Sequence, residues 1–400
     1  MQPSWKALIE DATQHRRALH RRPELSWQEE RTAADIRQRL ETLQIPWQAC
    51  AGTGTIGQLA PQAKGPQIAL RADIDALPIV EATGHPWASQ TEGRMHACGH
   101  DGHTAVLLAV AAWLKARESE LPGPVRLIFQ PAEEGGHGAE AMIRDGALEG
   151  VDRIFGWHNW PAIPFGQAVC PDGPVMSANG VFEIQIAGRG AHASQPEVAH
   201  DPLLAATDIT QNLQQIVARR LPPQSAAVVS VTQLHAGDAI TAIPDTAWMA
   251  GSVRVGRTDQ RDAIVEHMRQ IVADTARAHR VEAEFTFTPR YGATVNHAGA
   301  AAHYRDALAG ILGPQWQDER LPVPIMASED FSYYLQEIPG AFALIGANDG
   351  DGPAEPCHSP RYDFNDRLLD PVGRLLVTLA GLEPPAATSD SAQENAGQNP

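Results

Sequence analysis

Two kinds of hydrophobic pattern alternate along most of the chain. Apolar side chains at helical spacing predict helices at residues 6–20 and about 28–43, and an apolar helical run also covers 105–114. Uninterrupted apolar runs predict short buried strands, which lie at 67–70, 125–129, 153–157 and 341–345. A closing helix is predicted at about 365–380. Buried strands that alternate with helices are typical of an α/β fold.

The pattern changes between residues 178 and 292. Six elements are predicted there in the order β-α-β-β-α-β, at 181–187, 201–219, 226–234, 246–255, 258–279 and 281–288. This order is that of a ferredoxin-like α+β unit. We therefore expect an inserted domain at 178–292, within a discontinuous domain formed by 1–177 and 293–382. Residues 383–400 are mostly small and polar, so we expect a disordered tail.

Length and charge narrow the class of protein. The 400 residues exceed one ordinary core, which favours two domains. The net charge is −17 and the basic residues are scattered, which argues against nucleic acid or an anionic membrane as a partner. No apolar run has the ~18 residues of a membrane helix, and no signal-peptide core precedes residue 22. The four cysteines are too scattered for a disulfide framework, so we expect a cytoplasmic protein.

The densest cluster of reactive side chains lies between Met95 and Thr104. It holds three histidines, an aspartate and Cys98, with glycines that permit a tight backbone turn. A thiolate and an imidazole two positions apart, Cys98 and His100, suit a divalent transition metal because one loop can direct both at the same ion. The alternative is a buried cysteine beside a polar turn. The donors found further along the chain favour the metal.

Further candidate donors follow the predicted strands. Asp73 and Asp75 come after the first strand, and the pair Glu133-Glu134 comes after the second. His158 ends the third run. Ligands bind at the carboxyl ends of parallel strands, so we expect these side chains to share one site. In a metal site one glutamate of a pair can bind the ion while its neighbour acts as general base. Turn capping and solvated surface are the simpler alternatives for the acidic residues.

Taken together, these motifs resemble the co-catalytic metallo-aminoacylase and carboxypeptidase family, peptidase family M20. The similar branch contains hippurate hydrolase, indole-acetyl-amino-acid hydrolases and N-acetyldiaminopimelate deacetylase. The resemblance implies a mixed-sheet, aminopeptidase/phosphorylase-like catalytic domain of the α/β class with an inserted dimerisation or lid domain. The matching blocks are 16–25, 71–78, 95–104, 130–138, 190–193, 328–331 and the loop around His358.

The resemblance also implies roles for individual residues. Two divalent ions would be held by Cys98, His100, Glu134, His158 and His358. Zinc and manganese are the metals expected first, with cobalt and nickel as alternatives. Glu133 falls at the position of the general base, and Asp75 at that of the acid that orients the metal site. His192 would reach the active site of a dimer partner and stabilise the oxyanion. A homodimer or a higher homo-oligomer is therefore expected.

The sequence departs from the family where the substrate's carboxylate is bound. The family's Asn-x-Ile-Pro turn is Thr241-Ala242-Ile243-Pro244 here, which leaves Thr241 at the position of a usual substrate-binding asparagine. Arg254 is the retained candidate for holding the carboxylate.

The expected activity is that of an amidohydrolase. It would hydrolyse the amide of an N-acyl or N-aroyl amino acid, a small-molecule substrate, to a carboxylic acid and a free amino acid. A dipeptidase or carboxypeptidase of the same family is the nearest alternative. A metal-binding protein without catalysis is a different class, which the intact Glu133 argues against. A structural zinc protein fits less well, because such sites use four ligands in local pairs.

Overall fold

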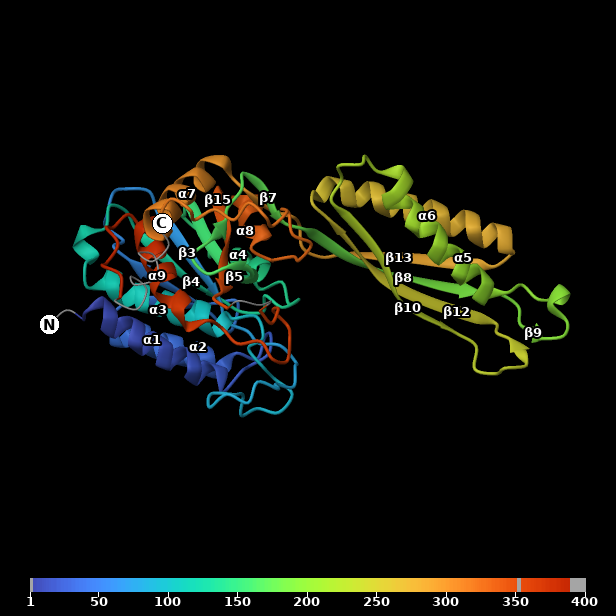
Figure 1. Ribbon diagram of the computed structural model, residues 1–400, viewed down its shortest axis with the longest axis horizontal. Helices are drawn as coiled ribbons and strands as arrows, with labels where there is room; N and C mark the ends of the chain where they lie inside the picture. Colours follow the sequence, from blue (N-terminus) through green and yellow to red (C-terminus); the bar gives the residue numbers. More distant parts are fainter. Residues whose placement is uncertain (1–2, 351–353, 389–400) are drawn as a thin grey trace. The chain divides into compact units, whose positions relative to one another are not determined.

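The computed structural model describes residues 3–350 and 354–388, and the chain divides into two compact units. The first unit contains the chain up to Gly173, Val295–Pro322 and the chain from Asp330 onward. The second contains Pro174–Thr294 and Val323–Glu329. Figure 1 shows the chain by colour from one end to the other. No helix within the described residues is both long and apolar enough to span a membrane.

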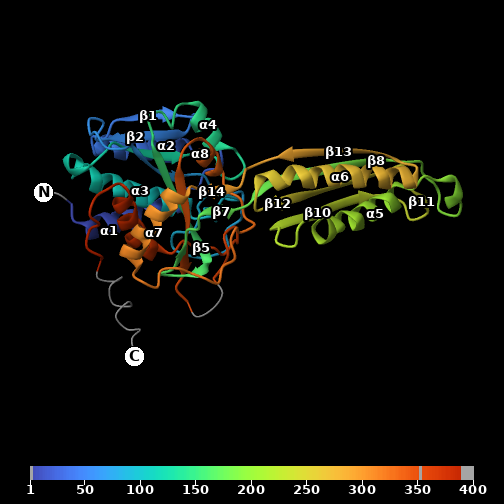
Figure 2. The same ribbon diagram turned by 90° about the horizontal axis from the view of Figure 1, so that it is seen from above.

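A mixed seven-stranded sheet forms the centre of the first unit (Figures 1 and 2). Its strands, in the order in which they pair, are β1 (Trp47–Cys50), β2 (Gly54–Leu59), β4 (Val125–Gln130), β3 (Ile68–Asp73), β5 (Arg153–Pro164), β15 (Gly340–Asn348) and β6 (Ala168–Val169). The four strands from β4 to β15 are parallel to one another, and the remaining three pair antiparallel. The α/β class with a mixed sheet is thus confirmed.

Both faces of the parallel strands are buried. On β15, Ala341, Ala343 and Ile345 belong to the main hydrophobic core, whereas the alternate residue Phe342 contacts Phe331 with ring centroids 5.0 Å apart. Strands covered on both faces need apolar residues at every position. This explains the uninterrupted apolar runs in the sequence.

In the described part of the first unit, seven α-helices surround the sheet. They are α1 (Trp5–His20), α2 (Glu30–Thr42), α3 (His100–Lys115), α4 (Gly138–Arg144), α7 (Ala298–Leu312), α8 (Ser332–Glu337) and α9 (Leu369–Leu379). Helix α3 contacts α1, α2 and α9, and nearly all its side chains are buried. It begins at His100, five residues before the predicted apolar run, because Gly99 takes a left-handed conformation (φ 97°) that starts the first turn there.

Several elements of the first unit were not predicted from the sequence, among them β1, β2, α4 and α8, and two further features also differ. His158 does not end its strand, because β5 continues to Pro164 and pairs with β15 beyond that point. Helix α7 was not predicted. Its buried face consists largely of alanines, among them Ala300, Ala301 and Ala307, which give little hydrophobic contrast.

The second unit is a four-stranded antiparallel sheet with two helices. The elements follow the chain as β8 (Ala178–Ala187), α5 (Pro202–Gln215), β10 (Ala227–Ala236), β12 (Thr246–Val255), α6 (Thr258–His279) and β13 (Glu282–Pro289). The strands pair in the order β10-β12-β8-β13, and α5 and α6 lie on one face (Figures 1 and 2). Short pairs are formed by β9 (Ala191–His192) with β11 (Ala242–Ile243) and by β7 (Gly173–Met176) with β14 (Thr294–Asn296). Helix α5 ends earlier than predicted, in a π-helical turn at Ile216–Arg220.

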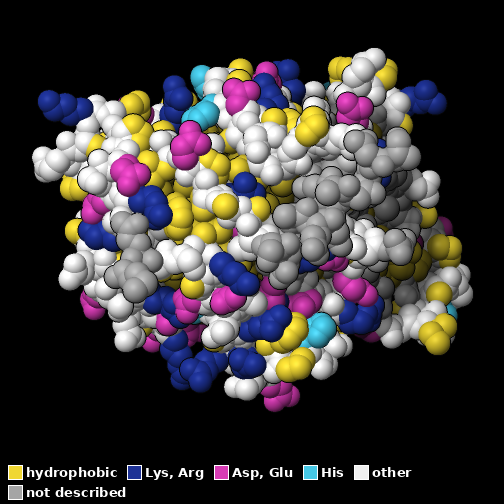
Figure 3. Space-filling model, turned by 60° about the vertical axis from the view of Figure 1, so that its left-hand side comes forward, with side chains coloured by type: hydrophobic (Ala, Val, Ile, Leu, Met, Phe, Trp, Pro, Cys, Tyr) yellow, Lys and Arg dark blue, Asp and Glu magenta, His cyan; other side chains and the backbone are white. Residues whose placement is uncertain are grey.

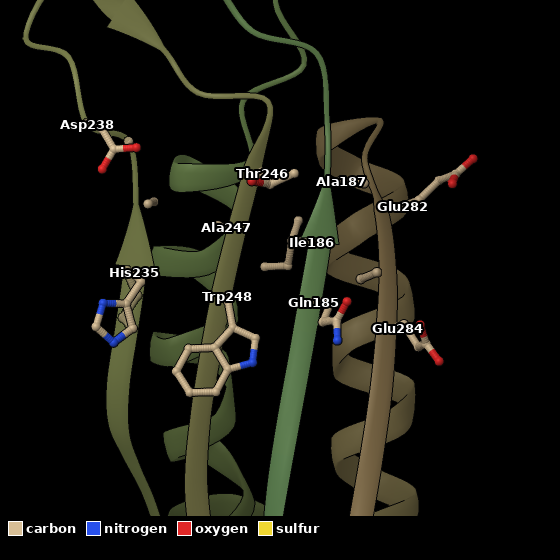
Figure 4. Close-up of a pocket in the computed structure, with 14 residues that line it drawn as sticks. Gln185, Ile186, Ala187, His235, Asp238, Thr246, Ala247, Trp248, Glu282 and Glu284 are labelled. Atoms are coloured by element: carbon tan, nitrogen blue, oxygen red, sulfur yellow. The ribbon is translucent and has the colours of Figure 1, made fainter.

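The face of this sheet opposite the helices is open. A hollow of about 900 Å³ lies on it (Figure 4). A row of paired residues crosses the hollow, one from each strand: His235, Trp248, Gln185 and Glu284. None of its lining residues belongs to a cluster of possible metal ligands among the described residues, so this hollow is not the predicted metal site.

The last described residues of the chain belong to the first unit. The Arg374 side chain donates a hydrogen bond to the Pro385 carbonyl at 2.9 Å, so the beginning of the predicted tail contacts α9. Residues 389–400 lie outside the described residues, and their disorder stays a prediction. Lysine and arginine side chains are intermixed with acidic ones on the face shown in Figure 3.

Candidate metal centre

Six side chains from four separate segments of the first unit assemble into overlapping groups of possible metal ligands. The groups are Cys98/His100/His158, Cys98/Glu134/His358 and His100/Glu133/Glu134, and within each group the ligand atoms lie within 4.8 Å of one another. All five sequence-predicted ligands and the predicted base are therefore brought together. Cys98 belongs to two groups whose other members differ, which is the arrangement expected if one thiolate serves two ions.

Cys98, His100 and His158 form the buried floor of this cluster. The Cys98 Sγ lies 3.2 Å from His158 Nε2. The other nitrogen of His158, Nδ1, donates to the Asn159 carbonyl at 2.7 Å, and His100 Nδ1 donates to the Asp75 carbonyl at 2.9 Å. In the neutral form of each ring these bonds place the proton on Nδ1, so Nε2 is the nitrogen that can bind a cation. His100 Nε2 is buried and has no hydrogen-bond partner among the described residues.

The two adjacent glutamates have different surroundings. Glu133 is buried, and one of its carboxylate oxygens accepts a hydrogen bond from the Asp330 backbone at 3.3 Å. The Glu134 carboxylate lies 3.2 Å from Nε2 of His358, whose side chain is about half exposed. The His358 backbone is anchored by a 2.7 Å hydrogen bond from its N–H to the Ala97 carbonyl. His358 therefore lies at the solvent side of the cluster.

Asp75 fixes the loop that carries both glutamates. Its two carboxylate oxygens accept hydrogen bonds from the backbone N–H groups of Glu133 and Glu134, at 3.1 and 3.0 Å. The Ser26 hydroxyl donates to the same carboxylate at 2.7 Å. Because His100 also bonds to Asp75, this one residue orients a histidine and the glutamate loop together.

The electrostatics of the cluster fit a cation. Burial alone would lower the pKa of His100, but Asp73 and Asp75 outweigh it and raise the pKa to about 10. A hydrogen bond with the Cys357 thiol, together with burial, raises the pKa of Cys98. The carboxylates of Glu134 and Glu133 add to the rise in the pKa of Cys98, so negative charge surrounds both proposed ligands. A divalent cation would offset that charge and favour the thiolate and the unprotonated imidazole.

His192 and Thr241 lie together in the second unit. Ala242 pairs with His192 in the β9–β11 ribbon, and the Thr241 carbonyl accepts a hydrogen bond from the Ala193 N–H at 2.9 Å. The His192 ring is exposed, and its Nδ1 accepts a hydrogen bond from the Ser194 backbone at 3.2 Å. The Ser194 hydroxyl oxygen lies 2.7 Å from the same nitrogen. In the tautomer in which Nδ1 accepts both bonds, Nε2 carries the ring proton and can donate it.

Arg254 lies at the opposite end of the same sheet. Arg254 lies eight positions after Thr246 along β12, which corresponds to roughly 26 Å of extended chain. Substrate binding by Arg254 and by Thr241 stays a prediction. The Arg254 guanidinium donates to the Met326 carbonyl at 2.6 Å and has no carboxylate partner among the described residues. Burial lowers the pKa of this arginine.

A second buried network of hydrogen bonds and ion pairs involves the first turn of α3, and no role was predicted for it from the sequence. Asp101 accepts a hydrogen bond from His20 Nδ1 at 2.8 Å, and the buried Arg16 lies 3.7 Å from the same carboxylate. Burial alone would lower the pKa of His20, but the bond to Asp101 raises the pKa to about 9. The sequence block Arg16–His20 already contained the two basic residues, which contact Asp101, the residue directly after His100.

This network predicts a loss of stability at alkaline pH. The pKa of His20 is about 9 in the folded state and 6.5 ordinarily. Its contribution to the free energy of unfolding is therefore complete below pH 6.5 and is lost as the pH rises through 9. The loss should be on the order of 3 kcal/mol. Urea unfolding of the wild type and of His20→Gln at pH 6 and pH 9.5 measures it. The difference in free energy of unfolding between the two proteins should be smaller at pH 9.5 than at pH 6. An unchanged difference would refute the role given to the His20–Asp101 bond.

A third network joins Asp73, His103 and Asn159, of which only Asn159 was not singled out in the sequence. His103 Nδ1 lies 2.5 Å from Asp73 Oδ1, and His103 Nε2 lies 2.7 Å from Asn159 Oδ1. Both ring nitrogens are therefore occupied, and His103 is not available as a ligand. For Asn159 the sequence signal was its position directly after the candidate ligand His158.

Known proteins are similar to this chain over most of its length. The model for peptidase family M20/M25/M40 matches residues 69–381. The N-acetylcysteine deacetylase of Bacillus subtilis is 40% identical over 91% of this chain and 94% of its own length. The hippurate hydrolase of Campylobacter jejuni is 37% identical over 91% of this chain and 94% of its own. The crystal structure of the Bacillus subtilis YxeP protein, a dinuclear metal-binding peptidase of family M20, has a TM-score of 0.81 at 38% identity and covers 94% of this chain and 98% of that one. This chain therefore belongs to the M20/M25/M40 peptidase family.

Proposed function

We propose that this protein is an amidohydrolase that uses two divalent metal ions to cleave N-acyl or N-aroyl amino acids into a carboxylic acid and a free amino acid. The observation that carries the proposal is the assembly of Cys98, His100, Glu134, His158 and His358 around the separate carboxylate of Glu133. The deacetylase and hippurate hydrolase names of the similar proteins agree with amide-bond hydrolysis.

The chain's own residues account for the reaction. Bound ions would lower the pKa of a water molecule and polarise the amide carbonyl. Glu133, held by the Asp330 N–H, would accept the water's proton and pass it to the leaving amine. Asp75 keeps both glutamates and His100 in position during this transfer.

Two residues of the second unit complete the proposed site. His192 presents a free Nε2–H that would donate a hydrogen bond to the oxyanion of the tetrahedral intermediate. Arg254, which has no acidic partner in the described part of the chain, would hold the carboxylate of the amino-acid product. Thr241 lies beside His192, so any contact it makes to substrate would be near the oxyanion.

We further propose that the second unit is a dimerisation or lid domain and that His192 acts on the partner subunit. Ile240, next to Thr241 on this ribbon, is a fully exposed large hydrophobic side chain, as expected of a residue that a second copy covers. The edge strands of the sheet offer unpaired backbone groups for the same purpose. All four cysteines are free thiols, which supports a reducing, cytoplasmic compartment.

A substrate panel tests the proposed reaction. The purified enzyme, supplied with Zn²⁺, Mn²⁺ or Co²⁺, should release the free amino acid from benzoyl-glycine or from acetyl-amino acids faster than it cleaves dipeptides. Amino-acid release measured by chromatography gives kcat/KM for each compound. Faster turnover of dipeptides with a free C-terminus would assign the protein to the peptidase alternative.

A further inference from the structure

The buried residue Asn159 connects the metal cluster to a network behind it. Its side-chain nitrogen donates to the Cys98 carbonyl at 3.2 Å and to the Tyr362 hydroxyl at 2.7 Å. A carbonyl can only accept, so the amide nitrogen must face Cys98. The amide oxygen is then left to face His103 Nε2, at 2.7 Å. Asn159 itself lies on β5 directly after His158, so the strand that carries one proposed ligand also holds the loop of another.

His103 and Asp73 fix the orientation of this amide. Because Asn159 offers its oxygen, His103 Nε2 must donate a proton to it. The other ring nitrogen faces an oxygen of Asp73 at 2.5 Å, and the second oxygen of Asp73 accepts a 2.6 Å bond from Arg71. All four side chains are essentially inaccessible to solvent. Each has one orientation that satisfies its neighbours, so the chain of bonds is rigid.

The backbone next to Cys98 is fitted to Asn159. Gly99 has φ 97°, a conformation that favours glycine. A Cβ atom at residue 99 would collide with the Asn159 side-chain oxygen and would lie 2.8 Å from the Tyr362 hydroxyl. The loop therefore passes so close to Asn159 that only glycine fits, and a change at Asn159 acts directly on the loop that carries Cys98.

We propose that Asn159 is a positioning residue for the metal centre, and that it holds the Cys98 carbonyl in an orientation set by His103 and Asp73 so that the thiolate meets the ion. This inference rests on the proposed function, since it assigns a positioning role to a residue that hydrogen-bonds to the backbone of a proposed metal ligand. Removing a residue that orients a metal ligand typically weakens metal affinity by about 10–100-fold. Asn159 does not touch the substrate, so its effect must pass through Cys98.

The substitution Asn159→Asp tests the proposal with almost no change of shape. The new carboxylate can still accept from His103, but an oxygen now faces the Cys98 carbonyl and repels it. The protein is loaded with Co²⁺. We expect Cys98 to react with iodoacetamide at least about tenfold faster than in the wild type, the thiolate-to-cobalt absorption band to weaken, and half-saturation to need about 10–100-fold more Co²⁺.

Asn296→Asp is the matched control. Asn296 is also buried in the first unit, and its side-chain nitrogen donates to the carbonyls of Phe342 and Pro171 at 2.9 and 3.0 Å. This variant should lose thermal stability, as Asn159→Asp does, yet keep Cys98 protected and the absorption band intact. Equal loss of protection in both variants would show a general effect of destabilisation. An Asn159→Asp protein with wild-type protection and absorption would overturn the proposal directly.

A pair of substitutions at His103 gives an independent test if Asn159→Asp does not fold. The amide of His103→Gln can replace Nε2 and donate to Asn159, whereas the amide of His103→Asn reaches only the place of Nδ1, beside Asp73. The glutamine variant should protect Cys98 in the cobalt-loaded protein better than the asparagine variant. Identical protection in the two would refute the inference. If metal fails to protect Cys98 even in the wild type, the metal centre itself is wrong.

Discussion

Glu133→Gln should lower kcat by about 10²–10⁴-fold while the protein retains its metal. The amide of glutamine has nearly the shape of the carboxylate, but it cannot accept a proton from water. The Glu133 side chain is held by the Asp330 backbone, and it is Glu134 that lies beside His358. Elemental analysis and steady-state kinetics with the best substrate of the panel measure the two quantities separately.

Glu134→Gln and Glu140→Gln are the controls for this prediction. Glu134→Gln should lose bound metal, because it removes a proposed ligand from the group with Cys98 and His358. Glu140 is exposed on α4 just after the same loop, so its substitution removes the same charge without touching the cluster. Loss of metal in Glu133→Gln, with metal retained in Glu134→Gln, would reverse the roles of the two glutamates.

His192→Ala should lower kcat by about 10²–10³-fold with normal metal content, as expected for loss of one oxyanion donor. The reason is the Nε2–H that the ring carries when Nδ1 accepts from the Ser194 backbone. His235→Ala is the matched control, because His235 is another exposed histidine of the second unit, stacked on Trp248. The kcat and the metal content of His235→Ala should remain close to those of the wild type.

Mixing His192→Ala with Glu133→Gln tests whether His192 acts across a dimer. If it does, each heterodimer has one site with both lesions and one with neither. Random exchange of equal amounts should then restore about a quarter of wild-type activity. If His192 serves its own chain, every site keeps a lesion and mixing restores nothing. Heterodimers shown by mass spectrometry to form, yet inactive, would contradict action in trans.

The sequence predicted the elements that have strong hydrophobic contrast. The apolar runs became the parallel strands, and helix α6 at Thr258–His279 has the predicted bounds because its apolar positions repeat regularly over 22 residues. Helix α7 escaped prediction because alanine packs well in a core without standing out in a sequence. Strand β5 was predicted too short, since its extension past His158 depends on pairing with β15, a strand almost 200 residues away.

The donor types of the candidate site could be predicted, but their supporting partners could not. Cys98, His100 and Glu134 stand in short motifs whose chemistry is visible from residue type alone. The link between Asn159 and Cys98 joins residues 61 positions apart and depends on which way an amide points. The separation of Arg254 from Thr241 by most of a strand is likewise a matter of register in the folded sheet, which residue spacing does not reveal.

Metal removal and restoration tests the central claim most directly. The claim is that the cluster of Cys98, the histidines and Glu134 binds two divalent ions that the hydrolysis requires. Elemental analysis should find about two equivalents of divalent metal in each fully active chain. Exhaustive chelation should abolish hydrolysis of benzoyl-glycine or acetyl-amino acids, and adding Zn²⁺, Mn²⁺ or Co²⁺ should restore it. Full hydrolytic activity in protein shown by elemental analysis to be free of metal would contradict the account.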